Sequence, residues 1–80
     1  MKLPEFFRPI MWSWTFDEID VDAMKNTITI QALNYGDLKH WRWVAENFGR
    51  EVVKSVFDAN KKTNMDKHNA ELVELIFKFS

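Results

Sequence analysis

The sequence predicts an all-α protein, a compact bundle of four main short helices preceded by an N-terminal aromatic arm. Its only two glycines each close the same phrase, Ala-x-Asn-aromatic-Gly, at residues 32–36 and 45–49. Glycine commonly ends helices because it enters the left-handed conformation at almost no steric cost. Apolar residues recur at helical spacings of three and four on both sides of these phrases. We therefore predict successive helices that end at Gly36 and Gly49.

The length of 80 residues allows one domain, residues 1–80. A domain of this size buries roughly 60–65% of the surface of its unfolded chain, so its core is small. The chain nevertheless carries four Trp and seven Phe. Each large ring buries about 150–250 Å², and a core of this size is too small to enclose all of them. We expect some of the tryptophans at the surface or in an interface.

Residues 1–16 are expected to form the aromatic arm. Pro4 suits the first turn of a helix, whereas Pro9 would interrupt one five residues later. Seven large apolar residues follow within eleven positions: Phe6, Phe7, Ile10, Met11, Trp12, Trp14 and Phe16. We predict a short helical turn and then an irregular segment whose rings cover the core. A patch that faces a partner, centred on Trp12 and Trp14, is the alternative interpretation.

The next predicted helix spans residues 21–35. An acidic segment, residues 17–22, leads into its first turn and suits the positive end of a helix dipole. The apolar stripe consists of Val21, Met24, Ile28, Ala32 and Tyr35. Residues 27–30, Thr-Ile-Thr-Ile, alternate like a strand and are all β-branched. The length of the stripe and the glycine that follows favour the helix.

A third helix is predicted over residues 38–48, with Asp37 as its N-cap. Its core stripe comprises Leu38, Trp41, Val44, Ala45 and Phe48. Trp43 lies about 200° round the helix from Trp41, so both rings cannot point inward. We place Trp43 on the outer face with His40 and Asn47, flanked by the cations Lys39 and Arg42. An exposed Trp beside cations is either a packing residue or a contact anchor.

Two further helices complete the predicted bundle. The fourth covers residues 50–59, with an apolar face formed by Val52, Val53, Val56 and Phe57. A polar loop follows at residues 60–64, and Thr63 with Asp66 resembles a capping box. The last helix carries Met65, Leu72, Leu75, Ile76 and Phe79, which we expect in the core.

The residue inventory argues against catalysis and metal binding. Cysteine is absent, and the two histidines, His40 and His68, have no second ligand at zinc-binding spacing. No serine or threonine has the acid–base partners of a nucleophilic triad, and no glycine-rich phosphate loop is present. We expect a protein that is not an enzyme and needs no cofactor. The chain has no secretory signal and no apolar run that would span a membrane, so a cytoplasmic location is expected.

The helix pair at residues 37–59 has the outline of a helix-turn-helix, which raises DNA binding as an alternative function. Arg50, Lys54, Lys61 and Lys62 would then face the DNA. Residues 37–68 carry seven Lys or Arg against five Asp or Glu, while the whole chain has a net charge of −1. This excess is far smaller than in most DNA-binding domains.

The order of several features resembles a known family. These features are Leu3-Pro4, Trp12, Ile19-Asp20, residues 28–33, Gly36, Trp43, Phe48-Gly49 and Val52-Val53. Over roughly residues 3–60 they resemble a family of small, uncharacterised bacterial domains. Its members are often encoded beside nucleotidyltransferase-type toxins of abortive-infection systems, and some are described as antitoxin-like. The chain departs from the family pattern at Ser13 and Gln31. The resemblance implies a helical fold and a protein partner, and it supplies no site residues.

The sequence thus favours a non-catalytic protein-binding domain, a monomer or weak dimer, that neutralises a toxin-like enzyme. The expected contact surface combines two groups of residues. One group is Lys39, His40, Arg42 and Trp43, and the other is Trp12 and Trp14 of the arm. Buried rings with a polar rim can supply the affinity without any chemistry.

Overall fold

The computed structural model of the chain describes residues 2–61 and 67–77, except for the side chains of residues 60, 61, 67 and 69. All regular structure in these residues is helical, which confirms the all-α fold class. The elements are the 3₁₀ helices η1 (Glu5–Ile10) and η2 (Phe16–Glu18) and the α-helices α1 (Lys25–Tyr35), α2 (Leu38–Phe48), α3 (Arg50–Lys61) and α4 (Lys67–Phe77).

The N-terminal arm begins with η1, the predicted short helical turn. Pro9, which was expected to interrupt a helix, lies inside this six-residue 3₁₀ helix, one residue before its end. An irregular stretch follows as expected, and the further turn η2 was not predicted. Four apolar side chains of the arm lie in the core: Leu3, Phe7, Ile10 and Met11. The arm is therefore an integral part of the hydrophobic core.

The helix α1 confirms the helical interpretation of residues 27–30 over the strand alternative. It begins at Lys25, four residues later than the predicted start at Val21, because residues 21–24 form a turn that Asp20 stabilises. The Asp20 carboxylate accepts a hydrogen bond from Ala23 N at 3.2 Å, and the Asp20 carbonyl accepts one from Met24 N at 3.0 Å. Val21 is buried as expected, but Tyr35 at the other end of the stripe is 58% exposed.

Both glycines end helices as predicted, but for different physical reasons. Gly49 has φ = +94°, a backbone conformation that side chains other than glycine rarely adopt. Gly36 has an ordinary φ of −90°, so the expected left-handed ending is wrong there. A Cβ at residue 36 would lie 2.7 Å from Ala32 O and 2.8 Å from His40 Cβ. Glycine at this position permits a close approach between α1 and the start of α2.

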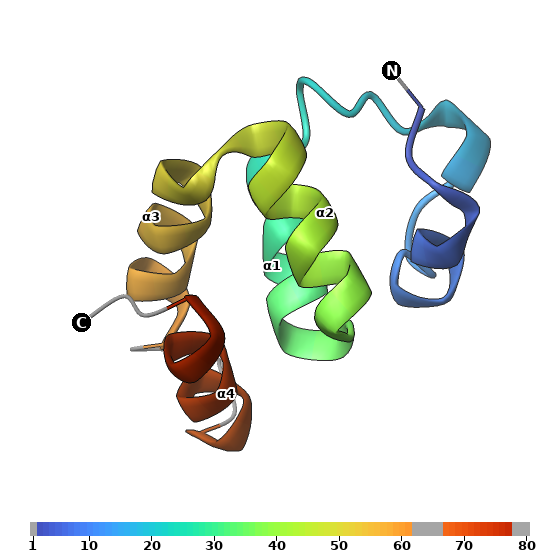
Figure 1. Cartoon of the computed structure of the whole chain (residues 1–80). Coiled ribbons are helices and arrows are strands. Elements are labelled where there is room, and N and C mark those ends of the chain that lie inside the picture. Colours follow the sequence, from blue (N-terminus) through green and yellow to red (C-terminus); the bar gives the residue numbers. More distant parts are fainter. Residues whose placement is uncertain (1, 62–66, 78–80) are drawn as a thin grey trace.

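The pair α1 and α2 forms the centre of the molecule. In Figure 1 the arm lies on one side of this pair and α3 on the other, with α4 below α3. Side chains from all these parts meet in one core: Leu3, Phe7, Ile10, Met11, Val21, Ile28, Ala32, Leu33, Trp41, Val44, Val53, Val56, Phe57, Val73 and Phe77. The helix α2 is thus covered from two directions, a circumstance that determines where its polar and aromatic residues lie.

The helix α4 turns a different face to the core than the sequence pattern predicts. Val73 and Phe77 are buried, whereas Leu75 is 72% exposed and Ile76 is 43% exposed. The prediction of Leu75 and Ile76 as core residues is therefore wrong, and Leu72 is partly buried. Four other predicted positions, Met65, Phe79 and the Thr63–Asp66 capping box, lie outside the described residues. Across residues 2–61 and 67–77, no helix is both long enough and apolar enough to cross a membrane.

Candidate protein-binding surface

The structure divides the predicted contact cluster on α2 into a buried and an exposed half. His40 is only 4% exposed, so its predicted place on the outer face is wrong. Lys39 and Arg42 are exposed, as predicted. His40 is buried because η1 packs over the side of α2 that was expected to face solvent. His40 therefore belongs to the core, and the two cations remain at the surface.

His40 joins the arm to the start of α2 through both ring nitrogens. Its Nδ1 accepts a hydrogen bond of 2.8 Å from the backbone N–H of Asp37. Its Nε2 lies 2.8 Å from the carbonyl oxygen of Phe6 in η1, which can only accept. One neutral tautomer, with the proton on Nε2, satisfies both partners. The ring also packs edge-on against Phe7, with centroids 4.8 Å apart.

Trp43 is partly buried and packs against the core, which corrects its predicted exposure. Its ring meets Phe7 at 5.1 Å and Phe48 at 5.3 Å between centroids, in edge-to-face arrangements typical of aromatic clusters. The Trp41 ring is buried on the other side of α2 and donates a 2.7 Å hydrogen bond from Nε1 to Ala32 O. Both rings point inward because α2 packs on α1 with one side and on the arm with the other.

Gln31 is a further buried polar residue that the sequence pattern did not single out. Its Nε2 donates a 2.7 Å hydrogen bond to the carbonyl oxygen of Ile10, at the end of η1. Gln31 and His40 thus hold the two ends of η1 against α1 and α2. The signal that could have identified Gln31 is its place between Ile28 and Ala32 on the apolar stripe of α1. A polar residue in that position needs a partner inside the core.

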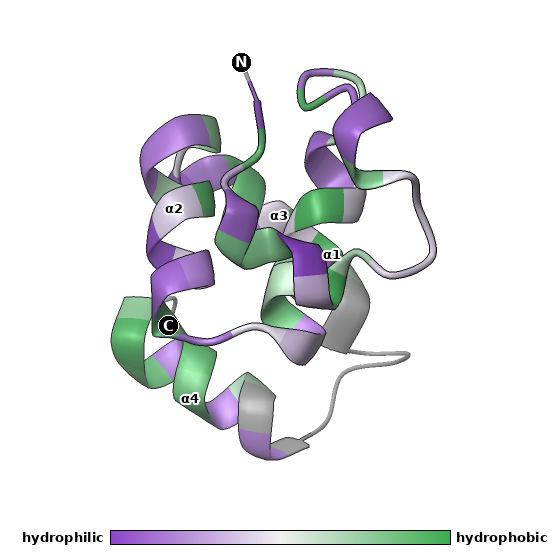
Figure 2. Cartoon of the chain, turned by 90° about the vertical axis from the view of Figure 1, so that its right-hand side faces the viewer, coloured by the Kyte–Doolittle hydropathy of each residue, from purple (hydrophilic) through white to green (hydrophobic). Residues whose placement is uncertain are grey.

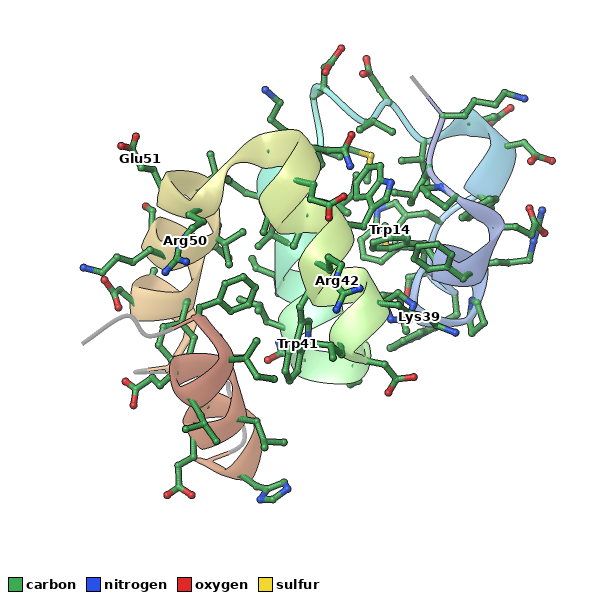
Figure 3. The ribbon with its side chains drawn as sticks, viewed as in Figure 1. Trp14, Lys39, Trp41, Arg42, Arg50 and Glu51 are labelled. Atoms are coloured by element: carbon green, nitrogen blue, oxygen red, sulfur yellow. The ribbon has the colours of Figure 1, made fainter. Side chains whose placement is uncertain are left out.

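Trp12 and Trp14 lie at the surface, as the partner-facing interpretation of the arm requires. Trp12 is 59% exposed and stacks edge-to-face on the exposed Tyr35 at the end of α1, with centroids 4.8 Å apart. Trp14 is 36% exposed and lines a small pocket beside η2. Figure 3 shows Trp14, a residue of the arm, on the opposite side of α2 from Arg50. The exposed predicted residues are therefore distributed over more than one area.

A second apolar area lies between α2 and α4, where it brings together Arg42 of the predicted contact surface and Arg50 of the DNA-binding alternative. A groove of about 410 Å³ is lined by Leu38, Arg42, Ala45, Glu46, Arg50, Ile76 and Phe77. Leu38 is 46% exposed here, which corrects its predicted core position. Figure 2 shows α4, much of it coloured as hydrophobic, next to the polar outer side of α2. The groove thus combines aliphatic walls with charged groups.

Of the residues proposed for DNA contact, Arg50 is bonded within the domain and Lys54 is exposed. Arg50 donates a hydrogen bond from Nη2 to the carbonyl oxygen of Phe77, and its guanidinium lies 5.9 Å from the centroid of the Phe77 ring. Arg50 therefore joins the start of α3 to the end of α4. Lys54 is exposed on α3. The side chain of Lys61 and all of Lys62 lie outside the described residues.

Among the residues that the structure describes, no three His, Asp or Glu side chains come together in a way that could hold a metal ion. Among the carboxylates that the structure describes, Glu5 is the one with a clearly shifted pKa, which hydrogen bonding to Arg8 lowers below its ordinary value. The Arg8 Nε–Glu5 Oε1 distance is 2.6 Å. This pair lies on the surface of η1, away from the groove.

Comparison with known proteins gives a family and no function. No curated protein and no solved structure shows significant similarity to the chain. A family of unknown function, DUF6922, matches residues 6–57, which is more than half of the chain. The matched segment runs from η1 through most of α3, and so includes the arm and both of its buried anchors, Gln31 and His40. The chain belongs to this family of unknown function.

Proposed function

We propose that the chain is a non-catalytic protein-binding domain, antitoxin-like, that neutralises a toxin enzyme in the bacterial cytoplasm. The observation that carries the proposal is the exposed Trp12–Tyr35 pair, in which both rings are more than half accessible. Tryptophan and tyrosine are enriched in protein interfaces, because a rigid ring buries a large area at low entropic cost. The edge-to-face contact holds both rings in place before any partner arrives.

The resemblance of the chain to antitoxin-like domains supplies the class of partner. Members of that family are often encoded beside nucleotidyltransferase-type toxins, so such an enzyme is the first candidate. An antitoxin acts by occupying a surface of its toxin and needs no reactive group. The satisfied core and the exposed rings of this domain agree with that mode of action.

The test is co-expression of the full chain with the tagged products of its neighbouring genes. We expect one of them to be an enzyme that co-elutes with the chain in gel filtration and stops inhibiting growth. A central aromatic contact contributes about 2 kcal/mol or more, so Trp12→Ala should weaken the complex about 30-fold. Lys25→Ala, an exposed residue at the start of α1, is the matched control. Failure of every neighbouring product to bind would contradict the proposal.

DNA binding through α3 has weaker support. Arg50 already contacts Phe77 at the end of α4, and the chain as a whole is slightly acidic. Fluorescence anisotropy with a labelled duplex distinguishes the two functions. Binding at about 50 mM salt that falls steeply by about 200 mM would favour DNA, because phosphate contacts release counterions. We expect no binding at the lower salt concentration.

A further inference from the structure

We propose that the groove between α2 and α4 binds an amphipathic helix of the partner protein that carries an acidic residue beside its apolar stripe. This inference rests on the proposed protein-binding function and names the chemistry of the segment that is bound. It uses a surface separate from the Trp12–Tyr35 pair.

The apolar walls of the groove come from two helices. Leu38 on α2 is 46% exposed and Ile76 on α4 is 43% exposed, and both line the groove. Leu75, the neighbour of Ile76, is 72% exposed. The helix α4 therefore has apolar residues on an outer face as well as on the face that buries Val73 and Phe77. A helix that is apolar on both faces is normally covered on both.

The charges of the groove favour an acidic partner. The side chain of Arg42 lines the groove, is exposed, and makes no hydrogen bond or ion pair with another described residue. Arg50 lines the same groove, whereas Lys39 lies on the arm side of α2, with its Nζ 5.7 Å from the centroid of the Phe6 ring. Figure 3 shows Arg42 projecting from α2 and Arg50 from the start of α3. Among the described lining residues these two arginines stand against one acidic residue, Glu46.

The shape of the groove favours a helix over an extended strand. Its walls are two helices, and the described residues contain no sheet whose edge a strand could extend. A helix laid between two helices presents apolar residues at positions i, i+3 or i+4, and i+7. An Asp or Glu next to that stripe would face Arg42. The partner segment is therefore defined by two features, an aliphatic stripe and an adjacent carboxylate.

The experiment selects such a segment without assuming its source. A phage-displayed library of random 16-residue peptides is selected on the immobilised full-length chain, and synthetic copies of the selected peptides are titrated by fluorescence anisotropy. We expect the peptides to share apolar residues at helical spacing and at least one Asp or Glu beside them. Their helicity should rise on binding, as measured by circular dichroism.

Two variants test the walls and the charge separately. Ile76→Asp places a carboxylate on the apolar wall, and Arg42→Glu reverses the unpaired charge. Each should weaken peptide binding at least about tenfold. Arg42→Glu removes a close charge pair, which contributes about 1.5 kcal/mol or more, and Ile76→Asp sets an unpaired carboxylate against the apolar stripe of the peptide. Lys54→Glu, an exposed cation of α3 that does not line the groove, is the matched control and should change affinity less than twofold. Circular dichroism of all three variants verifies that they are folded.

Each other outcome overturns the groove proposal in a recognisable way. Peptides that respond to Trp12→Ala but not to Ile76→Asp or Arg42→Glu would show a protein-binding domain that uses another surface. If the selected peptides lack acidic residues and bind the Arg42→Glu variant with unchanged affinity, the proposed role of charge is wrong. A concentration-dependent dimer abolished by Ile76→Asp would identify a second copy of the chain as the occupant. Selection of no peptide at all would refute the groove, while co-elution with a neighbouring gene product would still support the proposed function.

Discussion

At the scale of single residues, the domain depends on a few polar side chains that lie inside it. His40, Gln31 and Trp41 each reach a backbone carbonyl of another element. No buried side-chain nitrogen or oxygen lacks a partner among the residues that the structure describes. A buried polar group is costly only when it is unpaired, so each of these contacts fixes one arrangement of neighbouring elements. Polar residues thus determine where the arm sits on the helices.

Replacement of His40 is expected to loosen the arm. His40→Ala removes a buried ring and leaves the Asp37 N–H and the Phe6 carbonyl without their partner, which should cost about 2–4 kcal/mol. The free energy of unfolding in urea measures the loss. His68→Ala, an exposed histidine on α4, should change stability by less than about 0.5 kcal/mol. Nitrogen chemical shifts should identify the Nε2–H form as the neutral tautomer of His40, and the Nδ1–H form would contradict the assigned bonds.

The two glycines should respond differently to the same substitution. Gly49→Ala has open space for its Cβ but keeps a strained backbone, at a cost of about 1–3 kcal/mol. Gly36→Ala has an ordinary backbone but places its Cβ against Ala32 O and His40. We expect both variants to be destabilised in urea unfolding. Only Gly36→Ala should shift the ring signals of His40 in nuclear magnetic resonance spectra, and equal shifts in both variants would contradict this distinction.

At the scale of elements, the helical class and the helix ends at Gly36 and Gly49 could be predicted from the sequence, whereas several exposed positions could not. Trp41 and Trp43 lie on different sides of α2, and the sequence pattern allows only one inward side. The arm provides a second covered side, so Trp43 and His40 also face inward. Leu38 and Ile76 are the opposite case. Their places on apolar stripes predicted burial, but both are exposed because too few elements pack around them. Periodicity identifies a helix, while the number of its neighbours depends on the tertiary arrangement.

The helix η1 provides a prediction of pH dependence. The hydrogen bond from Arg8, reinforced by its charge, lowers the pKa of Glu5 from the ordinary value of 4.5. A lowered pKa in the folded state means that the contribution of the pair to stability is present above pH 4.5. This contribution is lost as the pH falls through the pKa of the folded state. We expect a carbon-detected titration to place the Glu5 midpoint below 4.5, and Arg8→Gln should return it towards that value.

At the scale of the whole molecule, the arm and the helices share one core. Leu3, Phe7, Ile10 and Met11 of the arm are buried together with residues of all four α-helices. An 80-residue domain has little apolar area to spare, so four such side chains form a large share of its stability. The sequence predicted that rings of the arm cover the core. It did not indicate that the arm also supplies backbone acceptors, at Phe6 and Ile10, for buried side chains of α1 and α2.

The position of the arm in the core determines how the domain unfolds. Because the arm completes the core, it should unfold together with the helices in one transition. In urea, the unfolding transition of the helices is measured by far-ultraviolet circular dichroism, and that of the aromatic cluster by near-ultraviolet circular dichroism. The two transitions should coincide. Phe7→Ala removes a fully buried ring at the junction and should lower the free energy of unfolding by about 3–5 kcal/mol. Trp14→Ala, whose ring is 36% exposed in the same arm, should cost much less. An aromatic transition that precedes the loss of helix would show instead that the arm is a separate, weakly attached unit.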